Sequence, residues 1–238
     1  MAEPKKQNYL HGAAILAAGV VIMKILGFIY KVPLGNILGD EGYTHFLVAY
    51  NIYSVFLTVA TAGLPVALSR MISEANTMNR PNQVKRIFSV AWLTFCVLGV
   101  VCTLIMFLFP TELADALNDV EASQSILALS PAVLLVCLTS AYRGYCQGHE
   151  NMKPTTVGQV LEVLVKVVIG LVLAWYLKDL GKSLPLVSAG AIFGVTAGSL
   201  AALVYMFAYK RRNYAALPGG GDEPESRGQI LSTLLKVG

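Results

Sequence analysis

Residues Ile87–Phe109 read IFSVAWLTFCVLGVVCTLIMFLF, a run of 23 residues without a charged side chain. The hydrocarbon core of a bilayer is about 30 Å thick, so a helix needs about 20 apolar residues to cross it. A strand of a membrane barrel would instead alternate apolar and polar residues over about ten positions. This stretch does not alternate and is long enough to cross. It therefore predicts a transmembrane helix.

Five further apolar runs flank this one along the chain. Only helices and closed barrels satisfy every backbone polar group in lipid, and these runs are too long for barrel strands. The chain of 238 residues is 55% apolar and 13% charged, with a mean hydropathy of +0.62, whereas soluble domains are roughly 25% charged. We therefore expect an all-α polytopic membrane protein with six transmembrane helices, at about 11–38, 43–69, 87–109, 124–142, 155–177 and 184–209.

The basic residues outside these runs favour one side of the membrane. Thirteen of the 18 Lys and Arg residues precede the first helix, follow the sixth, or belong to the second or fourth connection. The first and third connections contain acids and no base, and only Lys178 and Lys182 in the fifth depart from the pattern. The positive-inside rule then places residues 1–10 and residue 238 in the cytoplasm, in a plasma-membrane protein. The net charge of +4 reflects this topology, and we expect no nucleic-acid partner.

The C-terminal part of the sequence changes character after the sixth apolar run. Residues 210–229 include a Gly- and Pro-rich polar stretch, which predicts a flexible cytoplasmic linker. Residues 230–238 are again apolar and predict the start of a seventh, truncated helix. We therefore expect this six-helix lobe to have a partner in a C-terminal half of the same protein.

Four ionisable residues fall inside predicted helices, where each costs about 2.5–3.5 kcal/mol on insertion scales. Lys24 and Lys31 are seven residues apart and share one face of the first helix. Lys24 lies about 20 Å from the cytoplasmic end, which favours a water-filled cavity, whereas Lys31 can extend to the outer headgroups. Cations in a cavity attract a phosphate or diphosphate. The fifth helix carries the other two residues, Glu162 and Lys166.

Glu162 and Lys166 have the i,i+4 spacing and order that favour a helical ion pair. They form either a self-neutralised pair or a coupling and gating site that faces the cavity. Asn51 on the second helix is either a helix–helix hydrogen-bonding group or a substrate contact. Arg143, at the cytoplasmic end of the fourth helix, is either a topology anchor or a contact for a substrate headgroup. The predicted substrate-binding residues are thus Lys24, Lys31, Asn51 and Arg143.

No pattern of catalytic or metal-binding residues emerges from the sequence. His11, His45 and His149 have no acidic or cysteine partner at metal-ligand spacing, and the four cysteines form no CxxC pair. There is no Gly-rich phosphate loop, GxSxG or HExxH motif. We therefore expect no enzyme activity, no metal site and no cofactor.

Several short stretches resemble the stage V sporulation protein B group, in the polysaccharide transporter branch of the multidrug/oligosaccharidyl-lipid/polysaccharide (MOP) exporter superfamily. The resemblance extends over residues 8–212. Its motifs are AYRGYCQG at 141–148, NMKPT at 151–155 followed by Gln159 and Glu162, GFIYKVPL at 27–34, GDEGY at 39–43, and AGLP at 62–65 with SR at 69–70.

The resemblance implies the N-terminal lobe of a two-lobed, MATE-like transporter. It also implies alternating-access flipping of a lipid-linked oligosaccharide, such as an undecaprenyl-diphosphate-linked peptidoglycan precursor, in polysaccharide, cell-wall or spore-cortex biosynthesis. Membrane lipids would surround the lobe. In MurJ-like flippases of this superfamily, basic residues of the first two helices face a central cavity, and Lys24 matches one such position. The others fall on uncharged residues here, Tyr30, Leu57 and Thr58.

Three alternatives remain open at this point. A cation-coupled multidrug exporter of the same fold should have an acid deep in the first helix, where this chain has lysines. A membrane-embedded glycosyl- or acyl-transferase would need a His or Asp cluster at the interface, and none is visible in the sequence. A non-transporting scaffold of cell-wall assembly would show the same helices.

Overall fold

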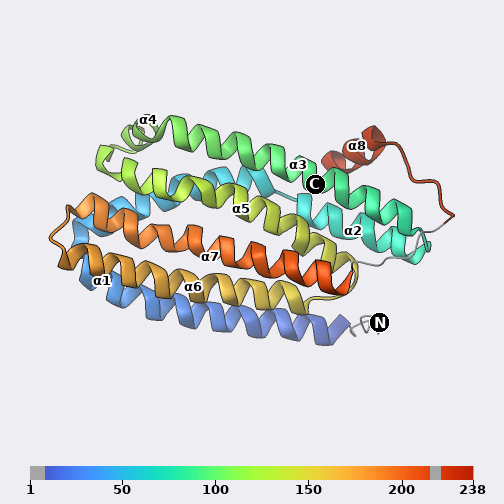
Figure 1. The fold of residues 1–238 in the computed structure, drawn as a ribbon, viewed down its shortest axis with the longest axis horizontal. Coiled ribbons are helices and arrows are strands. Elements are labelled where there is room, and N and C mark those ends of the chain that lie inside the picture. Colours follow the sequence, from blue (N-terminus) through green and yellow to red (C-terminus); the bar gives the residue numbers. More distant parts are fainter. Residues whose placement is uncertain (1–8, 215–220, 238) are drawn as a thin grey trace.

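The computed structural model describes residues 9–214 and 221–237, and all regular structure in these two ranges is helical. Long helices run roughly side by side (Figure 1). Their bounds are α1 Tyr9–Thr61, α2 Leu64–Thr77, α3 Pro81–Leu108, α4 Pro110–Asp115, the 3₁₀ helix η1 Val120–Ala122, α5 Ser123–Gly148, α6 Lys153–Asp179, α7 Leu184–Asn213 and α8 Arg227–Val237.

The helix α1 is two antiparallel arms that meet at Gly39 (Figure 1). A straight helix of its 53 residues would be about 80 Å long, more than twice the hydrocarbon core. Gly39 has φ 66° and ψ −173°, a conformation open essentially only to glycine, and it reverses the chain. Lys178 of α6 donates hydrogen bonds to the carbonyls of Asn36 (3.3 Å) and Ile37 (2.5 Å). These carbonyls lie in the last turn of the first arm. Lys178, which departs from the charge pattern, therefore binds the end of this arm.

Five stretches of the described chain are long and apolar enough to cross a membrane. The first, Ala14–Thr77, has 64 residues and contains the reversal at Gly39, so it holds two of the six predicted segments. Large apolar side chains cover the outside of the bundle, among them Phe28, Val59 and Val66, each about 70% exposed. The all-α membrane fold predicted from the sequence is confirmed.

The core lies where α5 and α7 pack between the other helices. Cys137 of α5 and Ile192 of α7 are completely buried. Small residues let α6 and α7 approach closely: a Cβ at Gly194 would lie 2.6 Å from the carbonyl oxygen of Lys166, and one at Gly170 would lie 2.7 Å from that of Ala191. Such contacts are typical of helix pairs in membranes, where close backbone packing replaces the hydrophobic effect.

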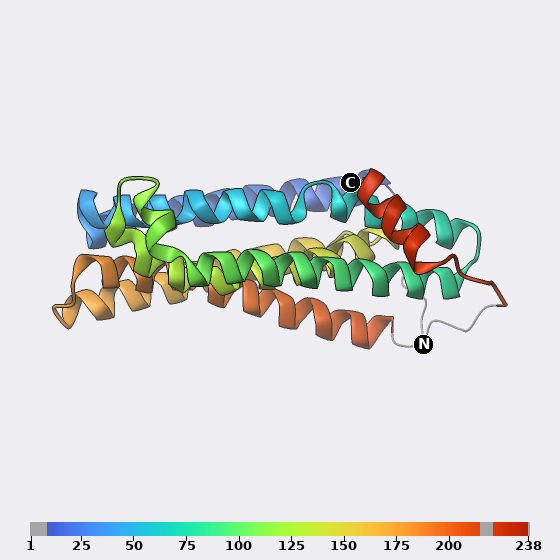
Figure 2. The ribbon, with the colours of Figure 1, turned by 90° about the horizontal axis from the view of Figure 1, so that it is seen from above.

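The two ends of the bundle differ. One, the α4 end, holds the Gly39 reversal, α4, η1 and the α6–α7 turn; the other, the α8 end, holds the α2–α3 and α5–α6 turns (Figures 1 and 2). α8 crosses α2 and α3 at an angle and buries Ile230 and Leu234 (Figure 2). Before α8, the Asp222 carboxylate accepts the backbone N–H groups of Asn82 (3.1 Å) and Gln83 (2.9 Å). Asp222 thus caps the N-terminus of α3 and ties the segment before α8 to the bundle.

Candidate functional site

A cavity of about 250 Å³ lies between the two arms of α1 and the helices α5, α6 and α7. The side chains that line it are polar or charged on α5 and α6, aromatic on the second arm of α1, and otherwise apolar. They are Arg143, Gln159, Glu162 and Lys166; Tyr50 and Tyr53; and Met23, Leu57, Val136, Val163 and Val195.

An ion pair between α5 and α6 forms the polar centre of this cavity. The Arg143 guanidinium donates from Nη2 to Glu162 Oε2 at 2.6 Å, and the two side chains are only 15% and 20% exposed. The Ser199 hydroxyl of α7 donates to the other carboxylate oxygen at 3.1 Å. Charge-assisted hydrogen bonds of this length are among the strong ones in proteins. The buried Nε of Arg143 has no hydrogen-bond partner within the described ranges, so the guanidinium retains a donor for a ligand.

Lys166 lines the same cavity without pairing with Glu162. The ion pairs found among the described residues join Glu162 to Arg143 and do not include the predicted i,i+4 pair. The Lys166 ammonium instead lies over the Tyr30 ring, 5.7 Å from its centroid, a cation–π distance. The Tyr30 hydroxyl donates to the carbonyl of Ala191 at 3.2 Å, which fixes the ring. Arg143, Lys166 and Glu162 together are two cations and one carboxylate, so these three groups carry a net charge of +1.

The other predicted binding residues lie outside this cavity. Lys24 and Lys31 are exposed on the first arm of α1, and no ion pair of either is found within residues 9–214 and 221–237. A Cβ at Gly27, between them on the helix, would meet nothing within 4 Å, so this face is open. Asn51 is also exposed, next to the cavity-lining Tyr50. The structure therefore brings Arg143, Glu162 and Lys166 together and leaves Lys24, Lys31 and Asn51 on the surface of this chain.

A second cavity, of about 440 Å³, lies at the α8 end between α3, α5 and α7. The Lys210 ammonium is 4.0 Å from the ring centroid of Phe88 and 5.0 Å from that of Tyr145. Sequence reasoning treated Lys210 only as a topology signal. The sequence did offer one hint: two aromatic residues, Tyr142 and Tyr145, lie close to Arg143 in the sequence. Both line this cavity.

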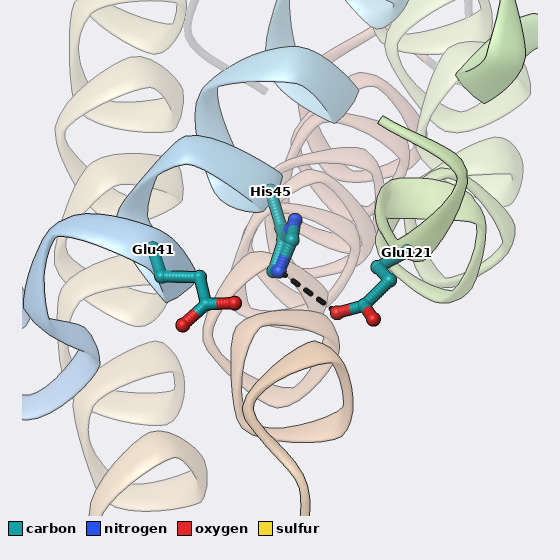
Figure 3. Close-up of side chains that lie close together, drawn as sticks. All are labelled: Glu41, His45 and Glu121. Atoms are coloured by element: carbon teal, nitrogen blue, oxygen red, sulfur yellow. Dashed lines mark ion pairs between the residues drawn. The ribbon is translucent and has the colours of Figure 1, made fainter. Parts of the chain in front are cut away.

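A third polar group lies at the α4 end, where Glu41, His45 and Glu121 approach one another (Figure 3). The sequence prediction that His45 has no acidic partner at metal-ligand spacing is wrong, because Glu41, four residues before it on α1, lies close to it. His45 Nδ1 lies 2.8 Å from both carboxylate oxygens of Asp119, a residue 74 positions away. No spacing rule reveals a pair so distant in the sequence.

Comparison with known proteins identifies the family. The family model described as "Polysaccharide biosynthesis protein" matches residues 9–233, nearly the whole chain. The chain belongs to this polysaccharide biosynthesis family. Among curated relatives, it is 32% identical over 203 residues to stage V sporulation protein B of Bacillus subtilis (strain 168), covering 85% of this chain and 39% of that protein. It is 28% identical over 218 residues to the lipid II flippase MurJ of the same organism, covering 87% and 40%.

Solved structures show the fold of this family member. A MATE protein in complex with MaD3S matches with a TM-score of 0.75 and 16% identity, covering 99% of this chain and 55% of that one. A MOP superfamily transporter from Pyrococcus furiosus matches with a TM-score of 0.72 and 17% identity, covering 100% and 54%. The predicted MOP/MATE-like fold is therefore confirmed. The chain spans about two-fifths of the length of the curated relatives and just over half of these structures.

Proposed function

We propose that this chain is the N-terminal lobe of a flippase that moves a lipid-linked oligosaccharide across the plasma membrane by alternating access. The observation that carries the proposal is the excess of positive charge in the cavity between α1, α5, α6 and α7. The curated relatives support the same class, because one of them is named a lipid II flippase and the family description is polysaccharide biosynthesis.

The cavity chemistry suits a diphosphate headgroup. The Glu162 carboxylate already neutralises the charge of the Arg143 guanidinium. The cation of this cavity that has no carboxylate partner among the described residues is therefore Lys166. A phosphate oxygen that reaches Arg143 competes with Glu162 for the same donors. Binding of the phosphate would then break the ion pair between Arg143 of α5 and Glu162 of α6. This exchange gives Arg143 a substrate-binding role and Glu162 the gating role predicted from the sequence. Lys166, for which the sequence also predicted a gating role, contacts the headgroup instead in this proposal.

The open face of α1 fits a second lobe. Lys24 and Lys31 face outward from this chain, and exposed lysines at membrane depth are costly unless water or a partner surrounds them. We infer that a C-terminal half of the same protein forms the opposite wall of a central cavity, into which Lys24, Lys31 and Asn51 project. The undecaprenyl-diphosphate headgroup would then contact Lys24 on the open face and Arg143 in the cavity between the helices.

We also infer the orientation of the lobe in the plasma membrane. The positive-inside rule places the α8 end, with Arg70, Arg80 and Lys210, in the cytoplasm. The N-terminus and residue 238 would lie on that side. The α4 end, with the acidic third connection, would face outward.

A cation-coupled multidrug exporter is the second candidate, because the fold matches a MATE protein. The charge of the cavity favours the flippase, since a net positive site attracts a diphosphate and repels a cationic substrate. The two functions can be separated by testing flipping and drug resistance in one strain.

The test is a set of Lys166 variants made in the whole transporter that contains this lobe. We expect Lys166→Met to lower precursor flipping at least tenfold in a strain depleted of its own flippase, and Lys166→Arg to retain part of it. Removal of a membrane-embedded charge lowers the cost of insertion, so protein level should not fall. Normal flipping by a well-inserted Lys166→Met protein would contradict the proposal. Drug resistance without flipping would favour the exporter.

A further inference from the structure

The group of side chains at the α4 end joins two parts of the fold. His45 lies in the second arm of α1, six residues after the Gly39 reversal, and Glu121 lies in η1, before α5 (Figure 3). His45 Nε2 is 3.3 Å from Glu121 Oε2. Glu41, His45 and Glu121 each offer one potential ligand atom, and these three atoms all lie within 4.8 Å of one another.

The hydrogen bonding of His45 fixes the direction of its free nitrogen. Nδ1 lies 2.8 Å from both oxygens of Asp119, and a carboxylate only accepts, so Nδ1 carries the proton. In a neutral imidazole the lone pair is then on Nε2, on the side of Glu121. The His45 side chain is only 7% exposed, and Nε2 has no hydrogen-bond partner in the described structure.

An empty site of this kind is electrostatically unfavourable. A lone pair on Nε2 and a carboxylate oxygen of Glu121 are both acceptors, and at 3.3 Å they repel. Glu41 and Asp119 add further negative charge around the same imidazole. A positive charge between Nε2 and the two glutamates removes the repulsion. That charge is either a second proton on His45 or a metal cation.

The distances suit a tetrahedral metal ion. Zinc bonds to His nitrogen and carboxylate oxygen are about 2.0–2.2 Å long, which places neighbouring tetrahedral ligand atoms about 3.4 Å apart. The observed separation of Nε2 and Glu121 Oε2 is 3.3 Å. Glu41 and Glu121 are exposed, so small rotamer changes bring the second carboxylate into the same shell.

We propose that Glu41, His45 and Glu121 bind a divalent transition-metal ion of the Zn²⁺ type at the α4 end of the lobe. His45 Nε2 and one oxygen of each glutamate are the ligands, and water fills the fourth position. The Asp119 carboxylate orients the imidazole, the usual outer-shell arrangement of zinc histidines. The imidazole ligand favours a transition metal over Mg²⁺ or Ca²⁺, which prefer oxygen alone. The bound ion links the α1 reversal to the connection between α3 and α5.

The experiment uses the purified chain in lipid nanodiscs after treatment with a chelator. Calorimetric titration with Zn²⁺ should give one site per chain, and Co²⁺ should give the visible absorption of a tetrahedral complex without a thiolate band. Excess Mg²⁺ should not displace either ion. We expect Glu121→Gln and Glu41→Gln each to weaken Zn²⁺ binding at least tenfold, and Asp119→Asn to weaken it by about 10–100-fold.

Control variants separate loss of a metal ligand from a general loss of acidic charge or of folding. Glu112→Gln removes another acid of the same connection, on α4, and should bind Zn²⁺ like the unaltered chain. His45→Gln should abolish binding, but His45 is buried, so the exposed glutamate variants carry the conclusion, with circular dichroism as a check of folding. Absence of saturable Zn²⁺ binding by the folded chain would overturn the proposal and leave a proton between His45 and Glu121. Binding unchanged in Glu41→Gln and Glu121→Gln would overturn it as well.

Discussion

The ion pair between Arg143 and Glu162 ties α5 to α6 inside the bundle, and a double-mutant cycle measures its contribution to stability. Arg143→Met leaves the Glu162 carboxylate with only the Ser199 hydroxyl, and Glu162→Leu leaves a guanidinium without its anion. Both groups are at most 20% exposed, so screening by water is weak. Breaking a buried pair from one side costs about 3–5 kcal/mol. We therefore expect each single variant to lose stability by this amount.

The double variant Arg143→Met/Glu162→Leu should behave differently from the sum of the two. Replacing both partners of a buried pair with apolar side chains is often neutral, so its stability should lie within about 1–2 kcal/mol of the unaltered protein. Unfolding in nanodiscs or mild detergent, followed by circular dichroism, gives the four free energies. The proposed function adds that the stable double variant should still fail to flip substrate. Additive losses in the cycle would refute the reasoning, because they would show that the two charges do not interact.

Three further predictions concern α1, the topology and the tail. Lys24→Ala should lower flipping at least tenfold with normal insertion, whereas Lys31→Ala should have a smaller effect; equal activities would contradict a deep cationic face. In a cysteine-free background, Ala116→Cys should react with an impermeant reagent from outside the cell and Met78→Cys should not; the reverse would invert the topology. Although desolvation opposes it, the backbone N–H groups of Gln83 and Asn82 hold the pKa of Asp222 below its usual value. Because the pKa of Asp222 is lower in the folded state, its carboxylate stabilises the fold fully at pH values above the ordinary Asp pKa of about 3.9. This stabilisation is lost as the pH falls through the pKa of the folded state. The protection of those two amide protons, measured against their intrinsic exchange rate at each pH, should therefore fall in acid, and Asp222→Asn should remove this pH dependence.

The sequence predicted the membrane-spanning part of the fold because lipid leaves few alternatives for a charge-free run. The stretch 87–109 falls almost entirely within α3, Pro81–Leu108. The bounds were less predictable at the α8 end, where α3 begins six residues earlier and α7 continues to Asn213. These helical extensions are polar, and hydropathy carries no signal for them. The angled packing of α8 on α2 and α3 has no sequence signal either, since it depends on contacts such as that of Asp222 with the start of α3.

Three of the charged residues that the sequence singled out line one cavity, but the ion pair there is not the one that their spacing predicts. Arg143, Glu162 and Lys166 stand out because charges at membrane depth are rare, and the fold brings them to one cavity. The i,i+4 spacing of Glu162 and Lys166 gives proximity worth only about 0.3–0.5 kcal/mol, even for a well-placed pair. The Arg143 guanidinium of α5 offers directional donors, and it pairs with the Glu162 carboxylate at 2.6 Å in place of Lys166.

This choice of partner changes which lysine matters in the cavity. If Glu162 neutralised Lys166, the remaining cation of the cavity would be Arg143, near the C-terminal end of α5. With Arg143 bound to Glu162, the available ammonium is that of Lys166, one helical turn farther along α6 and held over Tyr30. A cation–π contact leaves the ammonium protons free to donate to a phosphate, whereas an ion pair would occupy them. Under the proposed function, Lys166 is therefore the stronger candidate for headgroup binding in this cavity, and Lys24 is the candidate on the open face that we propose meets a second lobe.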